Sequence, residues 1–236
     1  MGRRYAILIG IMLILFGLLA LAFNLGAPIL APHLWEWGAW RLWPLVVVTV
    51  GLCLAAPPIL VRGQRGLGAL FIPATPILAT GGILLYASVL NRWDDWAWLW
   101  PVEVLSVALG FGLAALFTRG IWLLLPAMLI GTNGLILQYC AITGEWGLWA
   151  VLWALEPLSI GLAFLIINVK QRSLGLLVAG LILCGVAAAG LIGMTAIFTR
   201  WALINALGPA LLILVGLLTL ISSLARKPAV AEAASE

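Results

Sequence analysis

Charged side chains are scarce in this chain of 236 residues. Asp, Glu, Lys and Arg make up only 8% of it, whereas 65% of the residues are hydrophobic and the mean hydropathy is +1.21. A soluble globular domain carries about 25% charged and roughly 45–50% apolar residues, and a disordered chain stays solvated through low hydrophobicity and high charge. The composition therefore excludes both classes and predicts an integral membrane protein.

The residues that bind metals or form disulfides are also few. His33 is the only histidine, and the three cysteines, Cys53, Cys140 and Cys184, lie in separate apolar runs without a CxxC spacing. One histidine cannot provide paired haem ligands or an HExxH zinc site, and an odd number of buried cysteines argues against a disulfide framework. Phosphate-binding glycine loops and serine–histidine pairs are missing as well. We therefore predict no catalytic residue, no metal site and no cofactor, and hence a protein that is not an enzyme.

What the sequence does contain is a series of long apolar runs. A helix needs about 20 residues to cross the hydrocarbon core of a membrane, and no run shows the period-two alternation of a membrane barrel strand. Eight runs qualify: Ala6–Asn24, Trp43–Leu60, Ile72–Leu90, Trp100–Thr118, Ile121–Cys140, Ala150–Val169, Leu174–Met194 and Ile204–Leu224. The sequence predicts an all-α integral membrane protein with eight transmembrane helices, forming a single bundle over residues 1–224, with a disordered cytoplasmic tail over residues 225–236.

The basic residues lie mainly on one side of this eight-helix arrangement. One side holds Arg3, Arg4, Arg62, Arg65, Arg119, Lys170, Arg172, Arg226 and Lys227, and the other holds Arg41, Arg92 and Arg200. Short loops rich in Lys and Arg stay in the cytoplasm, so we expect both termini to be cytoplasmic in a bacterial inner membrane. The net charge of +4 then reflects orientation, and we expect no binding to nucleic acid.

Tryptophan is concentrated on the opposite, outer side. Twelve of the 13 tryptophans lie in or beside the predicted outer loops, and Trp122 alone lies at the inner side. Anchoring at the headgroup level is the ordinary role of such residues. The alternative is a surface that binds a lipid or another membrane protein. Its candidate contact residues are Trp35, Trp37, Trp40, Trp93, Trp96, Trp146 and Trp149.

The runs pair into four helical hairpins with common features. The second helix of each hairpin is expected to open with a proline, at positions 44, 101, 157 and 209, and the first helices share a glycine followed by aliphatic residues, at positions 17, 82, 134 and 180. Proline suits the first turn of a helix, and glycine permits close helix packing. We therefore predict four parallel repeats, approximately 1–65, 66–119, 120–172 and 173–224.

The first hairpin resembles a known family. Its glycine-aliphatic helix ends at Asn24-Leu25-Gly26, and its second helix opens on Trp43-Pro44 and contains Gly51. This pattern resembles the transmembrane region of LiaF-type proteins, and it covers the first repeat and, through Trp100-Pro101, part of the second. The resemblance implies a bacterial envelope-stress protein. Members of that family carry a soluble C-terminal domain, which we do not expect here because only 12 residues follow Leu224.

Two carboxylates, Glu103 and Glu156, lie in the first turn of predicted outer-side helices. We expect each to be an ionised interfacial group paired with Arg41, Arg92 or Arg200, because a helix N-terminus favours an anion and a charge is cheaper near the interface than at the bilayer centre. The alternative is an ion or polar-ligand site in a small transporter or channel, particularly if neighbouring hairpins bring the two carboxylates together.

These observations lead to three hypotheses. The first is an accessory, scaffold or sensor protein that binds membrane lipids and another membrane protein through its Trp-rich outer face. The second is the small transporter or channel that uses Glu103 and Glu156. The third is a pigment- or quinone-binding subunit, which the aromatic content permits although ligating histidines are lacking.

Overall fold

The computed structural model describes residues 38–61, 64–198 and 202–224, together with a few isolated positions before residue 38. All regular structure in these residues is helical, which confirms the predicted all-α class. Five helical stretches have the length and apolar composition of a membrane span: Trp40–Leu60, Arg65–Leu90, Pro101–Thr118, Ile121–Thr143 and Leu174–Phe198. The bent pair Trp146–Leu152 and Leu155–Gln171 makes a sixth if it is counted as one span. The run expected from Ala6 to Asn24 and the tail after residue 224 lie outside the described residues.

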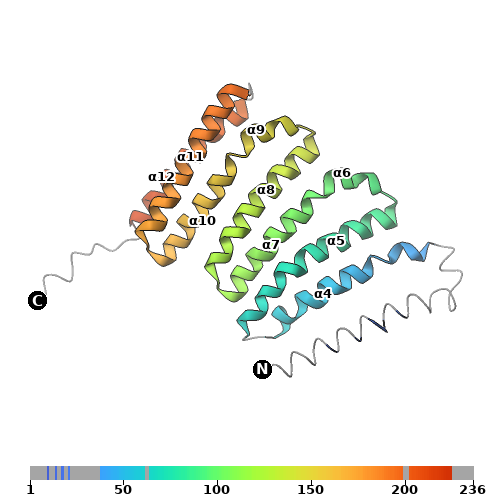
Figure 1. The fold of residues 1–236 in the computed structure, drawn as a ribbon. Helices are drawn as coiled ribbons and strands as arrows, with labels where there is room; N and C mark the ends of the chain where they lie inside the picture. Colours follow the sequence, from blue (N-terminus) through green and yellow to red (C-terminus); the bar gives the residue numbers. More distant parts are fainter. Residues whose placement is uncertain are drawn as a thin grey trace, which may run out of the picture. The chain divides into compact units, whose positions relative to one another are not determined.

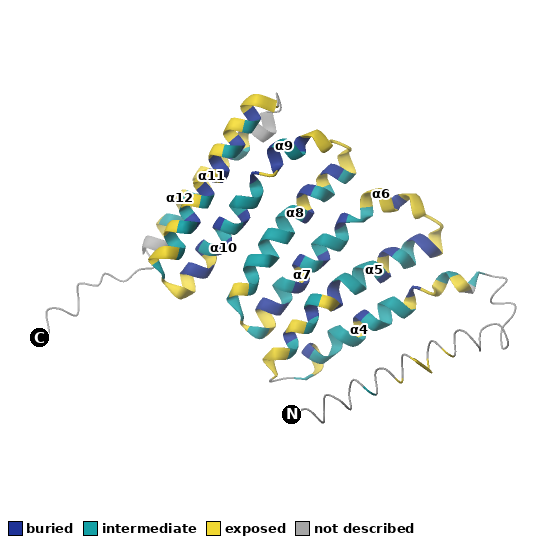
Figure 2. Ribbon diagram, in the orientation of Figure 1, coloured by how far each residue is buried: buried dark blue, intermediate teal, exposed yellow. Residues whose placement is uncertain are grey.

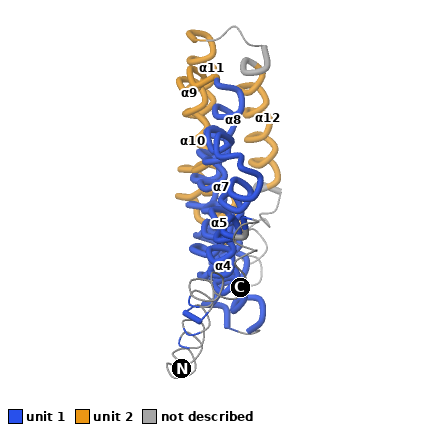
Figure 3. Tube along the Cα trace, turned by 90° about the vertical axis from the view of Figure 1, so that its right-hand side faces the viewer, with its two compact units in different colours: residues 1–144 blue, residues 145–236 orange. Residues whose placement is uncertain are grey.

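Two compact units divide the chain, residues 1–144 and 145–236 (Figure 3). Unit 1 contains η2 (Ala39–Leu42), α4 (Leu45–Leu60), η3 (Arg65–Leu70), α5 (Phe71–Leu90), η4 (Trp93–Asp95), α6 (Trp96–Leu99), α7 (Pro101–Thr118), η5 (Ile121–Leu123) and α8 (Leu124–Thr143). Unit 2 contains η6 (Trp146–Leu148), α9 (Trp149–Leu152), α10 (Leu155–Gln171), α11 (Leu174–Phe198) and α12 (Ala202–Leu224). Each unit is described by itself, so the single bundle stays a prediction.

The long helices of unit 1 form a row in chain order (Figure 1). Helix α4 packs on α5, α5 on α7, and α7 on α8, whereas no other pair of long helices in the described part of unit 1 makes comparable contact. In unit 2, α10 packs on α11 and α11 on α12. Short connections make long helices that follow one another in the chain run antiparallel. In unit 1, α4 and α7 therefore begin at one end of the helices, and α5 and α8 begin at the other end.

Few residues of the helices are buried, and most are intermediate or exposed (Figure 2). Only 11–33% of each candidate span is buried within the structure, and the exposed positions include large apolar side chains such as Leu116, Leu135 and Ile197. A soluble monomer rarely exposes so much contiguous apolar surface, whereas hydrocarbon solvates it without cost. The low burial is therefore consistent with a membrane-embedded protein.

Glycine brings neighbouring helices close, and three of these contacts recur in similar form. A Cβ atom added at any of three glycines would lie within 2.9 Å of a leucine or valine side chain on the partner helix. These contacts are Gly81 with Val48 in α4–α5, Gly134 with Leu105 in α7–α8, and Gly180 with Leu165 in α10–α11. Gly82, which the sequence pattern selected, faces open space. The packed glycine of α5 is therefore its neighbour Gly81.

The prolines occupy different places in their helices. Pro44 immediately precedes α4, Pro101 is the first residue of α7, and Pro157 is the third residue of α10, as expected for helix starts. Pro209 lies inside α12, which begins at Ala202, so the expectation that a helix opens there is wrong.

Before Pro157 the helix axis bends by 44°. Proline lacks the N–H that would bond to the C=O of Trp153, and that carbonyl accepts from the N–H of Glu156 instead.

Several helices end on a residue in the left-handed conformation. Gly144 (φ 74°) ends α8 in this way, as is usual for glycine. Asn91 ends α5, and two arginines, Arg119 (φ 59°) after α7 and Arg172 (φ 52°) after α10, adopt the same conformation. This conformation costs a non-glycine residue about 1–2 kcal/mol. Each left-handed residue stops its helix and turns the chain into the next one.

Candidate functional site

Short helical segments precede α4, α7 and α10, and we call them elbows: residues 38–43, 93–100 and 146–154. The first contains η2 alone, whereas the second and third contain a 3-10 turn followed by a four-residue helix, η4–α6 and η6–α9. The proline that follows each elbow cannot donate a backbone hydrogen bond. At the third elbow the helix axis bends by 44°, whereas the first elbow continues into α4 within the stretch Trp40–Leu60.

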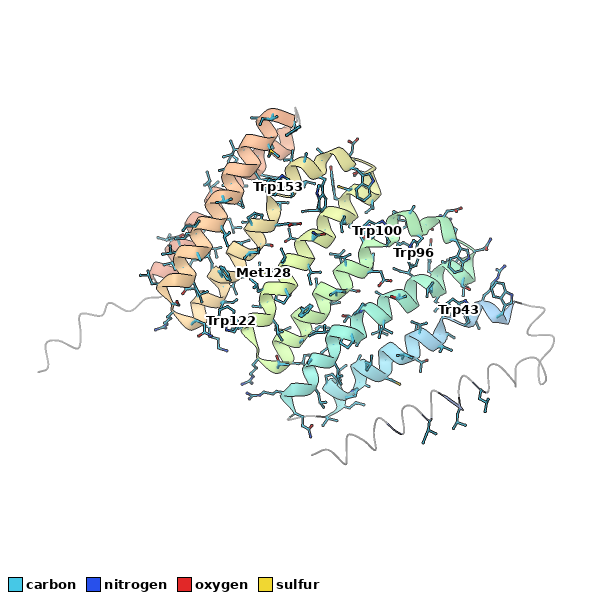
Figure 4. All side chains as sticks on the ribbon, in the orientation of Figure 1. Trp43, Trp96, Trp100, Trp122, Met128 and Trp153 are labelled. Atoms are coloured by element: carbon cyan, nitrogen blue, oxygen red, sulfur yellow. The ribbon has the colours of Figure 1, made fainter. Side chains whose placement is uncertain are left out.

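The elbows carry exposed tryptophans. Seven indole side chains are 36–48% exposed: Trp40, Trp43, Trp93, Trp96, Trp98, Trp146 and Trp153. Trp149 is half-buried, and Trp35 and Trp37 lie outside the described residues. In unit 1, Trp43, Trp96 and Trp100 lie at one end of the long helices, and Trp122 lies at their other end (Figure 4). We call the end of unit 1 that carries Trp43, Trp96 and Trp100 its tryptophan end.

A constant spacing relates the elbows. The pair Trp40 and Trp43 recurs 53 residues later as Trp93 and Trp96, and 53 residues after that as Trp146 and Trp149. The same spacing relates Glu103 to Glu156 and Ser106 to Ser159. In both copies the serine hydroxyl donates to the C=O of the glutamate three residues earlier, at 2.6 Å and 2.8 Å. The two glutamates thus occupy equivalent positions in the repeat and share this serine contact, although their distances from the prolines differ.

Asp95 organises the second elbow. It accepts a hydrogen bond of 2.6 Å from the Tyr86 hydroxyl of α5 and two of 3.1 Å from the Arg92 guanidinium. The bond from Tyr86, followed by the bonds from Arg92, lowers the pKa of Asp95 below its ordinary value of 3.8. These bonds fix the elbow to the end of α5, so the orientation of its tryptophans depends on Asp95.

We expect Asp95→Asn to lower the melting temperature of the detergent-solubilised protein by a few degrees at pH 7, because an amide cannot accept both guanidinium bonds. Since folding lowers the pKa of Asp95, its stabilising contribution is complete above pH 3.8 and disappears as the pH falls below that value. The difference between variant and parent should therefore vanish in acid. Asp94→Asn, at the exposed neighbour, is the control and should behave like the parent; equal melting of parent and Asp95→Asn at pH 7 would contradict the prediction.

Glu103 lies at the interface of α7 and α5. Its Oε2 is 2.9 Å from the Thr80 hydroxyl of α5, and its Oε1 is buried without a hydrogen-bond partner. The expected arginine partner is not observed: Arg92 pairs with Asp95, and the Arg41 guanidinium lies 5.9 Å from the centre of the Trp40 ring. Arg200 lies outside the described residues. For Arg41 and Arg92 the expectation is wrong, because Arg92 is three residues from Asp95, whereas Glu103 lies one turn inside α7 and faces α5. The arginine partner of Glu156 stays a prediction.

Further polar contacts continue along this interface and beside it. The Thr75 hydroxyl of α5 lies 2.7 Å from the C=O of Ser106, and Gln138 of α8 donates to the C=O of Trp98 at 2.8 Å. Glu156, in α10, belongs to unit 2. Its approach to Glu103 therefore stays a prediction.

An open groove of about 410 Å³ runs along α5 and α7. It is lined by Thr75, Leu78, Ala79, Val102, Leu105, Ser106 and Leu109. Its lining contains no charged side chain and only two hydroxyls, so it suits a hydrocarbon chain better than a polar substrate. Among the described residues no group of three or more His, Cys, Asp or Glu could hold a metal ion.

Comparisons with family models, curated proteins and solved structures find no match for this chain. The resemblance to the LiaF-type transmembrane region therefore rests on the residues of the first hairpin, and it stays a hypothesis.

Proposed function

We propose that this chain is a non-enzymatic bacterial inner-membrane protein that binds a membrane partner or lipid through its tryptophan-bearing elbows, as an accessory, scaffold or sensor. The observation that carries the proposal is the exposure of seven tryptophans on three short segments at helix starts. Tryptophan is the residue type most enriched at binding hot spots. A rigid elbow holds it at low entropic cost, because the indole has only two rotatable side-chain bonds.

We further propose eight spans with both termini in the cytoplasm. The described loops support this orientation, since Arg65 and Arg119 lie at the end of unit 1 opposite its tryptophan end. The proposal also includes four hairpin repeats. Their support is the 53-residue spacing of the elbows and the glycine contacts that recur in α4–α5, α7–α8 and α10–α11.

The charges beside the tryptophans favour a cationic partner group. Asp94 is exposed between Trp93 and Trp96, while the nearby Arg92 is engaged by Asp95. A lysine or arginine side chain, or the ammonium of a lipid headgroup, would gain from both the Asp94 carboxylate and the indole faces. We therefore expect the partner to present a positive group at the membrane surface.

A small transporter or channel that uses Glu103 and Glu156 is the alternative. Helix α7 has no polar side chain between Ser106 and Thr118, and α5 has none between Phe71 and Thr75. A polar pathway along these two helices would therefore stop midway, which favours the binding function.

The test replaces Trp93, Trp96 and Trp146 together with alanine. Each hot-spot tryptophan contributes about 2 kcal/mol or more to binding, and 1.4 kcal/mol is tenfold in affinity. We expect the co-purifying protein or lipid to fall at least about tenfold after purification in mild detergent, measured by mass spectrometry. A loss confined to proteins identifies a protein partner, and a loss confined to lipids identifies a headgroup.

Trp122→Ala is the matched control, since Trp122 is 51% exposed at the opposite end of unit 1. It should leave the co-purifying species unchanged. If the triple variant keeps the same species at the same occupancy, the tryptophans are only membrane anchors and the proposal fails.

A further inference from the structure

The Thr80 hydroxyl has two hydrogen-bond partners and only one proton. Its Oγ1 lies 2.8 Å from the C=O of Pro76 and 2.9 Å from Oε2 of Glu103. A hydroxyl donates once and accepts twice. If Glu103 were ionised, the hydroxyl would share its proton between two acceptors, as the Thr75 hydroxyl does between the C=O groups of Phe71 and Ser106. If Glu103 is protonated, its own O–H donates to Thr80, Thr80 donates to Pro76, and both short contacts are satisfied.

The other carboxylate oxygen leads to the same assignment. Oε1 of Glu103 is buried without a partner, and an ionised carboxylate in an apolar setting needs a counter-ion or several donors. The described elements that pack on α7 are α5, α6, α8, η3 and η5. Their titratable groups are Tyr86, which donates to Asp95, and Tyr139, Cys140 and Arg65. None of these groups bonds to Glu103, whose one side-chain partner is Thr80.

We propose that Glu103 is a proton-binding site, a neutral carboxylic acid held against Thr80 at the α5–α7 interface. The site goes beyond the proposed binding of a partner by the elbows and does not depend on it. Glu103 is the third residue of α7, so it exchanges its proton with the solution at the tryptophan end. Since α7 is apolar from Val107 to Phe117, the proton does not continue along α7 to the other end. The site therefore registers acidity on one side of the membrane. Loss of the proton leaves a charge that the α5–α7 interface cannot pair.

A hydrophobic carbodiimide tests the site in the full-length protein. The protonated acid transfers its proton to a reagent nitrogen while the carboxylate oxygen adds to the central carbon, and migration of the acyl group to nitrogen gives a stable N-acylurea that retains every reagent atom. Peptide mass spectrometry in nanodiscs should find Glu103 modified at pH 7 and the modification declining as the pH rises. The exposed Asp94 should stay unmodified. A water-soluble carbodiimide with an added amine should instead label Asp94 and spare Glu103.

Thermal stability supplies a second measurement. Glu103→Gln is the isosteric neutral variant, whose amide can donate to Thr80 in place of the acid. The parent should lose stability as the pH rises and the half-buried acid ionises, whereas Glu103→Gln should not. Glu156→Gln, at the equivalent position of α10, is the control and should keep the pH dependence of the parent. Glu103 that resists the hydrophobic reagent at every pH, or parent and Glu103→Gln curves that coincide, would overturn the proposal.

Discussion

Replacing Gly110 with alanine is expected to destabilise the protein by about 2 kcal/mol, although alanine favours a helix by roughly 1 kcal/mol over glycine. A Cβ atom at this position would collide with the Thr75 hydroxyl and would lie 2.7 Å from the C=O of Phe71 and 3.0 Å from Cα of Ile72. Two of these three groups are backbone, so α5 itself must move away from α7. Overpacking of this kind costs about 1–3 kcal/mol, and occasionally more. The expected loss also includes the contact between Thr75 and the C=O of Ser106.

Gly112→Ala is the control on the same helix. Nothing lies within 4 Å of a Cβ atom at position 112, so this variant should match the parent or exceed its stability by up to about 1 kcal/mol. Denaturation by sodium dodecyl sulfate, monitored by tryptophan fluorescence, compares the stability of the parent, Gly110→Ala and Gly112→Ala. Equal stability of the two alanine variants would show that α5 and α7 are not packed as closely as described.

A single cysteine at position 143 should react with a membrane-impermeant maleimide applied from outside, whereas one at position 64 should not react until the membrane is opened. Gln64 and Thr143 are both exposed and lie at opposite ends of the unit 1 row. The proposed cytoplasmic termini place residue 64 inside and residue 143 outside. With the membrane intact, we expect nearly complete reaction at position 143 and almost no reaction at position 64.

The experiment needs a parent without Cys53, Cys140 and Cys184. Cys140 and Cys184 are buried, so alanine is the suitable replacement, and wild-type melting behaviour should be checked first. Opening the membrane with detergent provides the positive control at position 64. Reaction of position 64 alone from outside would show that the orientation is opposite to the proposed one. Reaction of both positions from outside would show that they do not lie on opposite sides of the membrane.

The helices were predictable from the sequence because hydrophobicity determines them. Every described run except Ala150–Val169, which is divided between α9 and α10, appears as one helix near its expected bounds, and Pro101 begins α7 as expected. The segment before α5 was not predicted. Helix α5 begins at Phe71, one residue from the expected start, but the 3-10 helix η3 precedes it from Arg65 to Leu70. Gly68 allows this segment to pack against Phe117 and Thr118 of α7. That contact is tertiary, and no local pattern announces it.

The candidate site was less predictable than the fold. The repeat spacing was obscured because the second and third elbows contain a helical turn, α6 or α9, that the first lacks. Aligning the repeats on their prolines therefore places Glu103 and Glu156 at different positions of the repeat. Aligning them on the tryptophan pairs places the two glutamates at the same position. The partner of Glu103 depends on which face of α7 meets α5. Helix faces that are apolar all round carry little information about their neighbours.

Arg119 and Arg172 are larger residues than their left-handed backbone prefers. Glycine at either position would give a more relaxed folded protein. In the proposed orientation both arginines lie in cytoplasmic loops. While the chain is inserted into the membrane no helix packing exists, and a positive charge is the main signal that retains a loop in the cytoplasm. In that orientation, membrane insertion favours arginine at these two turns, whereas the left-handed backbone favours glycine.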